Sequence, residues 1–155
     1  MGCILTCYGA SGAPASISRD TCNFISPGCT PTPGQPRGGA RRTFLINQRI
    51  FDRNRVDLVS DVGRVDTWEI TNDTAMAHPF HIHGTQFQLV SRRLGTQVTP
   101  APYLAWIDTM LIPSQQAVTI KVRHTSAGKR MFHCHILEHE DNCMMAILDV
   151  RPASA

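Results

Sequence analysis

Residues 131–145 read MFHCHILEHEDNCMM, and this stretch decides how the chain folds and what it can bind. It combines one cysteine between two histidines with a third histidine and a pair of methionines. A single thiolate, several imidazoles and a nearby thioether are the ligands that copper prefers at electron-transfer sites. The stretch therefore predicts a copper site.

Cys134 lies between His133 and His135 in a run that is typical of an extended strand. Successive side chains of a strand point to opposite faces, so Cys134 faces away from the two histidines. We expect Cys134 to bind a copper inside the domain with His139, a more distant imidazole and Met144 as a weak axial ligand. His133 and His135 would serve a separate centre on the opposite side.

A second group of histidines supplies the missing imidazoles, because residues 78–84 read HPFHIHG. His81 and His83 share one face by the same period of two, whereas Pro79 kinks the backbone before them. His78 is therefore free to bind a different metal ion from its two neighbours.

Both motifs resemble those in the C-terminal cupredoxin domain of the multicopper oxidases, the family of laccases, bilirubin oxidases and cuprous oxidases. The resemblance covers about residues 43–151 and rests on HPFHIHG, on HCHILEHED and on Met144. It implies these type 1 copper ligands: His78, Cys134, His139 and Met144. It also implies ligands of a trinuclear copper cluster. The type 2 ligand would be His81, and the type 3 ligands would be His83, His133 and His135.

The resemblance also points to the catalytic residues. Glu140 falls where bacterial members keep an acidic residue implicated in delivering protons to reduced oxygen. Cys134 and Glu140 are therefore the expected catalytic residues, the first for electron transfer and the second for proton transfer.

From residue 43 onward, short apolar runs alternate with turn signals, which is typical of a β-sandwich. We expect strands over residues 43–51, 56–59, 65–71, 86–91, 117–124, 130–135 and 144–150. About eight strands without a convincing helix indicate an all-β, Greek-key cupredoxin sandwich or barrel over residues 42–155. Residues 1–41 are rich in Cys, Ser, Thr, Gly and Pro, which predicts an irregular, poorly structured arm or linker.

The composition limits the class of protein further. A chain of 155 residues with 42% apolar content suits one domain with a core, and no apolar run approaches the length of a membrane span, about 18 residues. The net charge of +3 is spread out without a basic block, which argues against a nucleic-acid partner. Residues 1–6 make a poor secretion signal, although the family resemblance implies a periplasmic or secreted location.

The cysteines outside the HCH motif have open roles. Four lie in the predicted arm and would form two disulfides in an oxidising compartment or stay thiols in the cytosol: Cys3, Cys7, Cys22 and Cys29. Cys143 stands where the family usually has Gly, so it is expected to strain the loop that holds Met144 or to compete as a soft ligand. A structural zinc site made from Cys134, Cys143 and two histidines is an alternative, but it leaves at least four histidines unexplained.

Two further positions have structural interpretations. Residues 106–109 resemble the Trp-x-Asp-Thr segment that precedes the last strands in the family, where we expect Trp106 to pack in the core and Asp108 to cap a turn or strand ladder. His124 is the one histidine outside both motifs, and we expect an ordinary surface or half-buried residue.

The histidine count limits the function. A family oxidase holds its trinuclear cluster with eight histidines, and this chain supplies only the four named above, so one chain alone cannot build the oxygen-reducing site. The first interpretation is a laccase-like oxidase unit that passes electrons from a phenol, a pigment or Cu(I) to O2 and completes its cluster with another copy of itself or with a second cupredoxin domain. A blue copper electron carrier and a truncated fragment of a larger oxidase are the alternatives, although a carrier needs none of the four cluster histidines.

Overall fold

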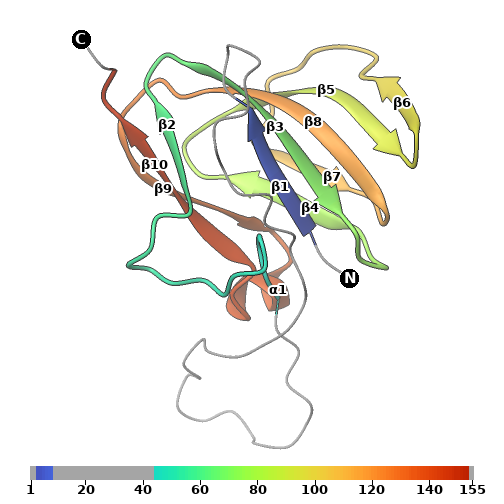
Figure 1. The fold of residues 1–155 in the computed structure, drawn as a ribbon, viewed down its shortest axis with the longest axis horizontal. Coiled ribbons are helices and arrows are strands. Elements are labelled where there is room, and N and C mark those ends of the chain that lie inside the picture. Colours follow the sequence, from blue (N-terminus) through green and yellow to red (C-terminus); the bar gives the residue numbers. More distant parts are fainter. Residues whose placement is uncertain (1–2, 9–43, 154–155) are drawn as a thin grey trace, which may run out of the picture.

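The structure is a computed structural model that describes the backbone of residues 3–8 and all of residues 44–153. Within these residues, ten strands form two five-stranded sheets (Figure 1). The first sheet has the order β1 (Cys3–Tyr8), β3 (Val65–Asn72), β8 (Gln116–Arg123), β5 (Phe87–Leu94) and β6 (Gln97–Pro100). The second has the order β2 (Leu58–Asp61), β10 (Met145–Arg151), β9 (Gly128–Cys134), β4 (His78–Ile82) and β7 (Thr109–Ile112).

The connectivity is that of an all-β sandwich, as the sequence predicts. Strand neighbours are antiparallel except for β10 and β2, which run parallel. One short helix, α1 (Leu137–Asp141), follows β9 and leads into β10. No helix in the described part of the chain is long and apolar enough to cross a membrane.

The core lies between the two sheets and holds them in position. Val118, Ile120 and Val122 alternate along β8 and are almost completely buried. Trp68 of the first sheet meets Phe132 of the second edge-on, with ring centroids 5.7 Å apart. Each such side chain stabilises the fold by about 1.5–3 kcal/mol, so packing fixes β9 against the opposite sheet.

Most of the predicted strands are present, and the exceptions are short. Six of the seven predicted ranges overlap β2, β3, β5, β8, β9 and β10. The range that begins at residue 43 is wrong: Ile46 and Arg49 form an isolated bridge around Asn47 (φ 52°) and Gln48 (φ 59°). No range was predicted for β4, β6, β7 or α1, because each spans only four or five residues, too few for a clear period.

Within the predicted arm of residues 1–41, the structure describes one strand. Cys3–Tyr8 form β1 and pair antiparallel with β3, with Cys3 opposite Asn72. An edge strand offers a row of unpaired N–H and C=O groups, so backbone pairing does not need an apolar pattern. Residues 9–43 and the pairing of Cys3, Cys7, Cys22 and Cys29 lie outside the described residues and side chains, and the domain boundary at residue 42 stays a prediction.

Two side-chain predictions are also wrong. His124 is fully buried, because it continues the inward-facing positions of β8. Trp106 is 57% exposed rather than part of the core. Its neighbour Ile107 takes the inward position and pairs with Phe87, so alternation turns Trp106 outward. Asp108 lies directly before β7, where its carbonyl accepts the N–H of Ile82, in line with the predicted ladder cap.

Candidate metal centre

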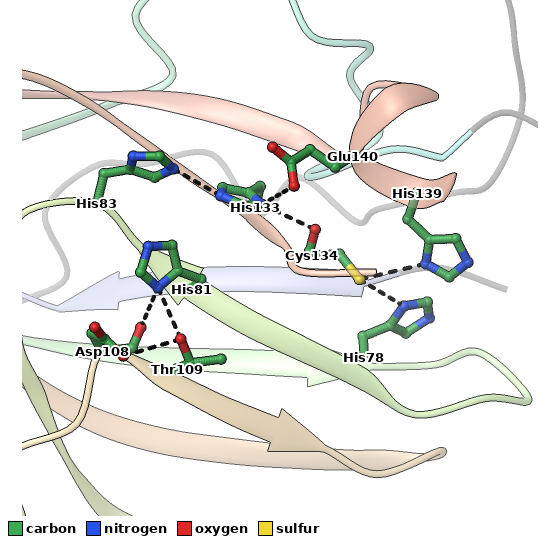
Figure 2. Close-up of polar contacts among 9 residues, drawn as sticks. All are labelled: His78, His81, His83, Asp108, Thr109, His133, Cys134, His139 and Glu140. Carbon is green, nitrogen blue, oxygen red and sulfur yellow. Dashed lines mark hydrogen bonds and ion pairs between the residues drawn. The ribbon is translucent and has the colours of Figure 1, made fainter. Parts of the chain in front are cut away.

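The register between β4 and β9 sorts the predicted ligands onto two faces. Phe80 lies opposite Cys134, and His81 lies opposite His133. Residues directly opposite in an antiparallel pair share a face, and the face alternates along each strand. The thiol of Cys134 therefore points into the core, while His81 and His133 point to the other side of the sheet (Figure 2).

Cys134 forms the inner cluster with two histidines. Its Sγ lies 3.5 Å from Nδ1 of His78 and 3.4 Å from Nδ1 of His139. One ligand atom from each residue lies within 4.8 Å of the other two, and all three residues are buried. Two imidazole nitrogens and one sulfur converging on a point fit the trigonal donor set of a blue copper site.

Two neighbours hold the imidazoles of this cluster in place. The hydroxyl of Thr74 lies 2.8 Å from Nε2 of His78, which leaves Nδ1 of that ring facing the sulfur. Phe44 stacks on His139 with ring centroids 4.1 Å apart. Neither neighbour stands out in the sequence, because no local spacing links Thr74 or Phe44 to the histidine motifs.

The turn after α1 brings Met144 to the same place. The N–H of Met144 donates to the carbonyl of His139, and the carbonyl of Met144 accepts the N–H of Cys134. Met144 is 2% exposed and belongs to the core cluster that contains Cys134. Backbone hydrogen bonds thus hold Met144 to Cys134 and His139, which carry two of the three converging ligand atoms.

Cys143 has a structural role in this turn. Its φ of 75° lies in the left-handed region, as expected for a position where glycine is common. The residue is disulfide-bonded. The hypotheses in which Cys143 competes for a metal or joins a zinc site are therefore wrong, because a disulfide sulfur offers no thiolate.

Burial sets the protonation of the inner cluster. Burial and then the nearby His139 lower the pKa of His78 to about 4, and burial also lowers the pKa of His139. Burial raises the pKa of Cys134 to about 11. At neutral pH the two imidazoles therefore offer lone pairs, and the thiol keeps its proton until a metal ion displaces it.

The second cluster lies on the opposite face. His81, His83 and His133 each offer a nitrogen within 4.8 Å of the others, and the Nε2 atoms of His83 and His133 are 2.8 Å apart. His135 is exposed, with its ring centroid 5.4 Å from that of His81 and 5.5 Å from that of His133. The four rings therefore form one group on the outer face of the second sheet, where β4 and β9 end.

Backbone carbonyls fix the tautomers of two rings in this cluster. Nδ1 of His81 lies 2.9 Å from the carbonyl of Asp108, and Nδ1 of His133 lies 3.0 Å from the carbonyl of Cys134. A carbonyl only accepts, so Nδ1 carries the proton in both rings and Nε2 keeps its lone pair. Such partners are the usual way in which proteins orient metal-binding imidazoles.

Glu140 of α1 lies beside the histidine cluster. Its Oε2 is 3.5 Å from Nδ1 of His133, and its side chain is 31% exposed. The carboxylate therefore connects the buried end of the cluster with the surface.

Comparisons with known proteins agree with this geometry. Residues 27–154 match the family model of the multicopper oxidases. The chain is 42% identical over 116 residues to a multicopper oxidase of Staphylococcus aureus, covering 72% of this chain and 26% of the relative. It is 37% identical over 143 residues to a bilirubin oxidase of Albifimbria verrucaria, covering 88% of this chain and 24% of the relative.

A solved structure has a similar fold. The multicopper oxidase from Campylobacter jejuni, described as a metallo-oxidase, superposes with a TM-score of 0.68 and 44% identity over 69% of this chain and 23% of that one. The chain thus spans about a quarter of the length of the relatives it matches. Its fold, its two clusters of potential metal ligands and these matches place the chain in the multicopper oxidase family.

Proposed function

We propose that this domain is a copper-binding unit of a laccase-like oxidase, with a type 1 copper site made by His78, Cys134, His139 and Met144. The observation that carries the proposal is the convergence of the Cys134 sulfur with the Nδ1 atoms of His78 and His139 at 3.4–3.5 Å. A buried cysteine with two neutral imidazoles is a ligand set that suits copper. The alternative zinc site would need a second thiolate.

The outer cluster is the proposed half of a trinuclear copper centre. His81 would be the type 2 ligand, and His83, His133 and His135 would be type 3 ligands. Cys134 is covalently linked to His133 on one side and to His135 on the other, so the two sites are joined through a few bonds. Bound copper would supply reversible one-electron transfer at Cys134 and the reduction of O2 to water at the histidine cluster.

Glu140 is proposed to handle protons for this reduction. Its carboxylate lies within 3.5 Å of His133 and is partly open to solvent. It can therefore take up a proton from water at Oε2 and hold it beside the histidine cluster, where the proton would be available to the oxygen being reduced. Cys134 and Glu140 remain the proposed catalytic residues.

The reducing substrate is proposed to be a small molecule: a phenol, a pigment or Cu(I). The relatives include a bilirubin oxidase, laccases and a metallo-oxidase, and each of these names describes that protein alone. The remaining cluster ligands come, in this proposal, from a second cupredoxin domain, because the described residues hold only four histidines on the outer face.

The test is the colour of the copper-loaded protein. Thiolate-bound Cu(II) in a type 1 site absorbs strongly in the red, so the wild type should be blue and Cys134→Ser colourless with its fold intact. Met144→Leu should stay blue and raise the reduction potential, because it removes a weak axial donor. A protein that binds copper stoichiometrically without a red band would contradict the assignment.

A further inference from the structure

Asn72 is the last residue of β3 and is completely buried. Its Nδ2 donates to the carbonyls of Met76, Ile112 and Pro113 at 2.8, 3.0 and 3.1 Å. Its Oδ1 accepts the N–H of Thr74 at 3.0 Å. A carbonyl only accepts and an N–H only donates, so these partners leave one orientation for the amide, with Oδ1 turned toward Thr74.

The hydroxyl of Thr74 lies between Asn72 and His78, and it has only one proton to donate. Its Oγ1 is 2.7 Å from Oδ1 of Asn72, 2.8 Å from Nε2 of His78 and 2.9 Å from the carbonyl of Met76. Oδ1 and the carbonyl carry no proton, so the hydroxyl proton has to point toward them. Oγ1 therefore accepts a hydrogen bond from Nε2 of His78, which carries the proton of that ring.

This chain of hydrogen bonds decides which nitrogen of His78 faces the metal site. With the proton on Nε2, Nδ1 keeps its lone pair, and Nδ1 is the atom that lies 3.5 Å from the sulfur of Cys134. Asn72 supports both acceptors of the Thr74 proton, because it provides Oδ1 and also holds the carbonyl of Met76. The tautomer that offers Nδ1 to a metal ion thus depends on Asn72.

Asn72 also anchors the loop of residues 73–77, which joins β3 to β4 and leads into His78. β3 belongs to the first sheet, whereas β4 and β7 are neighbours in the second. Ile112 is the last residue of β7, so the hydrogen bonds from Asn72 connect the two sheets where His78 enters the core. Ser114 holds the same loop by donating to the carbonyl of Thr74 at 2.7 Å, but its hydroxyl takes no part in the chain that ends at Nε2.

We propose that Asn72 is a positioning residue for His78, and that it acts through the hydroxyl of Thr74 to keep the lone pair of Nδ1 facing the sulfur of Cys134. The inference rests on the proposed function, because His78 is a proposed ligand of the type 1 copper. Partners that accept the second N–H of a metal-binding imidazole fix its tautomer and raise its basicity, and their loss typically costs roughly 10- to 100-fold in metal affinity.

Nitrogen NMR of the metal-free wild type tests the tautomer directly. At neutral pH the His78 ring should carry its proton on Nε2, and Nδ1 should have the chemical shift of a nitrogen without a proton. A proton on Nδ1 of His78 would overturn the proposed role of Asn72. The measurement needs neither a variant nor copper, so it decides the matter even where a substituted chain does not fold.

A double-mutant cycle tests whether Asn72 acts through Thr74. Asn72→Ala and Thr74→Val should each weaken Cu(II) binding by about 10-fold in competition with a chelator, and circular dichroism shows that each variant is folded. If one chain of hydrogen bonds carries both effects, the double variant should also lose about 10-fold, whereas independent effects would multiply to about 100-fold. Ser114→Ala is the matched control, because it releases the same loop without breaking the chain, and it should keep the wild-type affinity.

The results separate the role of Asn72 from the copper assignment. A double variant that binds about 100-fold more weakly than the wild type would overturn the action of Asn72 through Thr74. A Ser114→Ala variant as weak as Asn72→Ala would do the same, and both results leave the type 1 assignment standing. A wild type that binds copper without a red band would instead overturn the type 1 assignment and, with it, the role of Asn72.

Discussion

His124 should make the stability of this domain depend on pH between about pH 4 and pH 6.5. The imidazole is fully buried, and its Nε2 has no hydrogen-bond partner among the described residues. Nδ1 lies 3.1 Å from the hydroxyl of Thr85, which also accepts a hydrogen bond from Arg130. Burial, and then the charge of Arg130, lowers the pKa of His124 to about 4.

The direction in which stability changes with pH follows from proton binding in the folded and unfolded states. In the unfolded chain a histidine titrates near pH 6.5, whereas folded His124 stays neutral down to about pH 4. The unfolded state therefore binds more protons in this window, so stability is fully present above pH 6.5 and is lost as the pH falls. Integrating these two pKa values from pH 7 to pH 5 gives a loss of about 2 kcal/mol from this one residue.

His124→Leu removes the titrating group and keeps a buried side chain of similar size. Urea unfolding of the metal-free protein at pH 7 and pH 5 should show a pH dependence smaller than that of the wild type by about 2 kcal/mol. At pH 7 the variant should lose little stability, because it also removes a buried ring nitrogen without a hydrogen-bond partner, which costs about 1–3 kcal/mol. Thr85 keeps its hydrogen bond from Arg130.

The matched control is His135→Asn, which replaces an exposed histidine. Its unfolding free energy should follow the wild-type pH dependence, since no buried imidazole is removed. A His124→Leu variant with the wild-type difference between pH 7 and pH 5 would show that His124 is not held neutral in the folded state. The burial argument would then be refuted.

Two further predictions concern the turn at Asn47 and Gln48 and the contact between Thr74 and His78. Gln48→Gly should raise the stability by about 0.5–1 kcal/mol, because Asn47 and Gln48 both have positive φ in a two-residue turn and Asn-Gly is the preferred pair there. Thermal unfolding measures this gain in stability. Gln97→Gly in the exposed strand β6 is the control, and it should lower the melting temperature. Thr74→Val should weaken copper binding at the inner cluster by about 10-fold or more, because it removes the 2.8 Å contact that orients His78. Competition with a copper chelator measures the affinity. Thr74→Ser is the control and should keep the wild-type affinity, because it keeps the hydroxyl. An unchanged affinity in Thr74→Val would show that the hydroxyl does not position the ring.

Much of the candidate site is readable from local periodicity. The HCH and HIH tripeptides put the histidines on one face and the cysteine on the other, which needs only the two-residue repeat of a strand. The structure brings His78, Cys134 and His139 together in one group, and His81, His83 and His133 in another. The alternation of Val118, Ile120 and Val122 likewise indicates β8 without any tertiary information.

Several features depend on contacts that no local pattern reveals. Trp106 is exposed and His124 is buried, the reverse of what was expected, because Ile107 pairs with Phe87 and because β8 extends its inward face by one more residue. Cys3–Tyr8 form a strand because the edge of β3 is available for pairing, although their composition indicates irregular chain. Cys143 is disulfide-bonded, which its sequence neighbours do not predict.

The sequence by itself determined the kind of chemistry, since the type and spacing of the cysteine, histidines and methionine specify copper and divide the ligands between two faces. Only the tertiary structure decided which imidazoles meet which atoms. The register of β4 against β9 sets Phe80 opposite Cys134 and so brings His78 to the sulfur, across 56 residues of chain. Spacing along a strand is a local property of the backbone, whereas register and burial arise only when the two sheets pack around a common core.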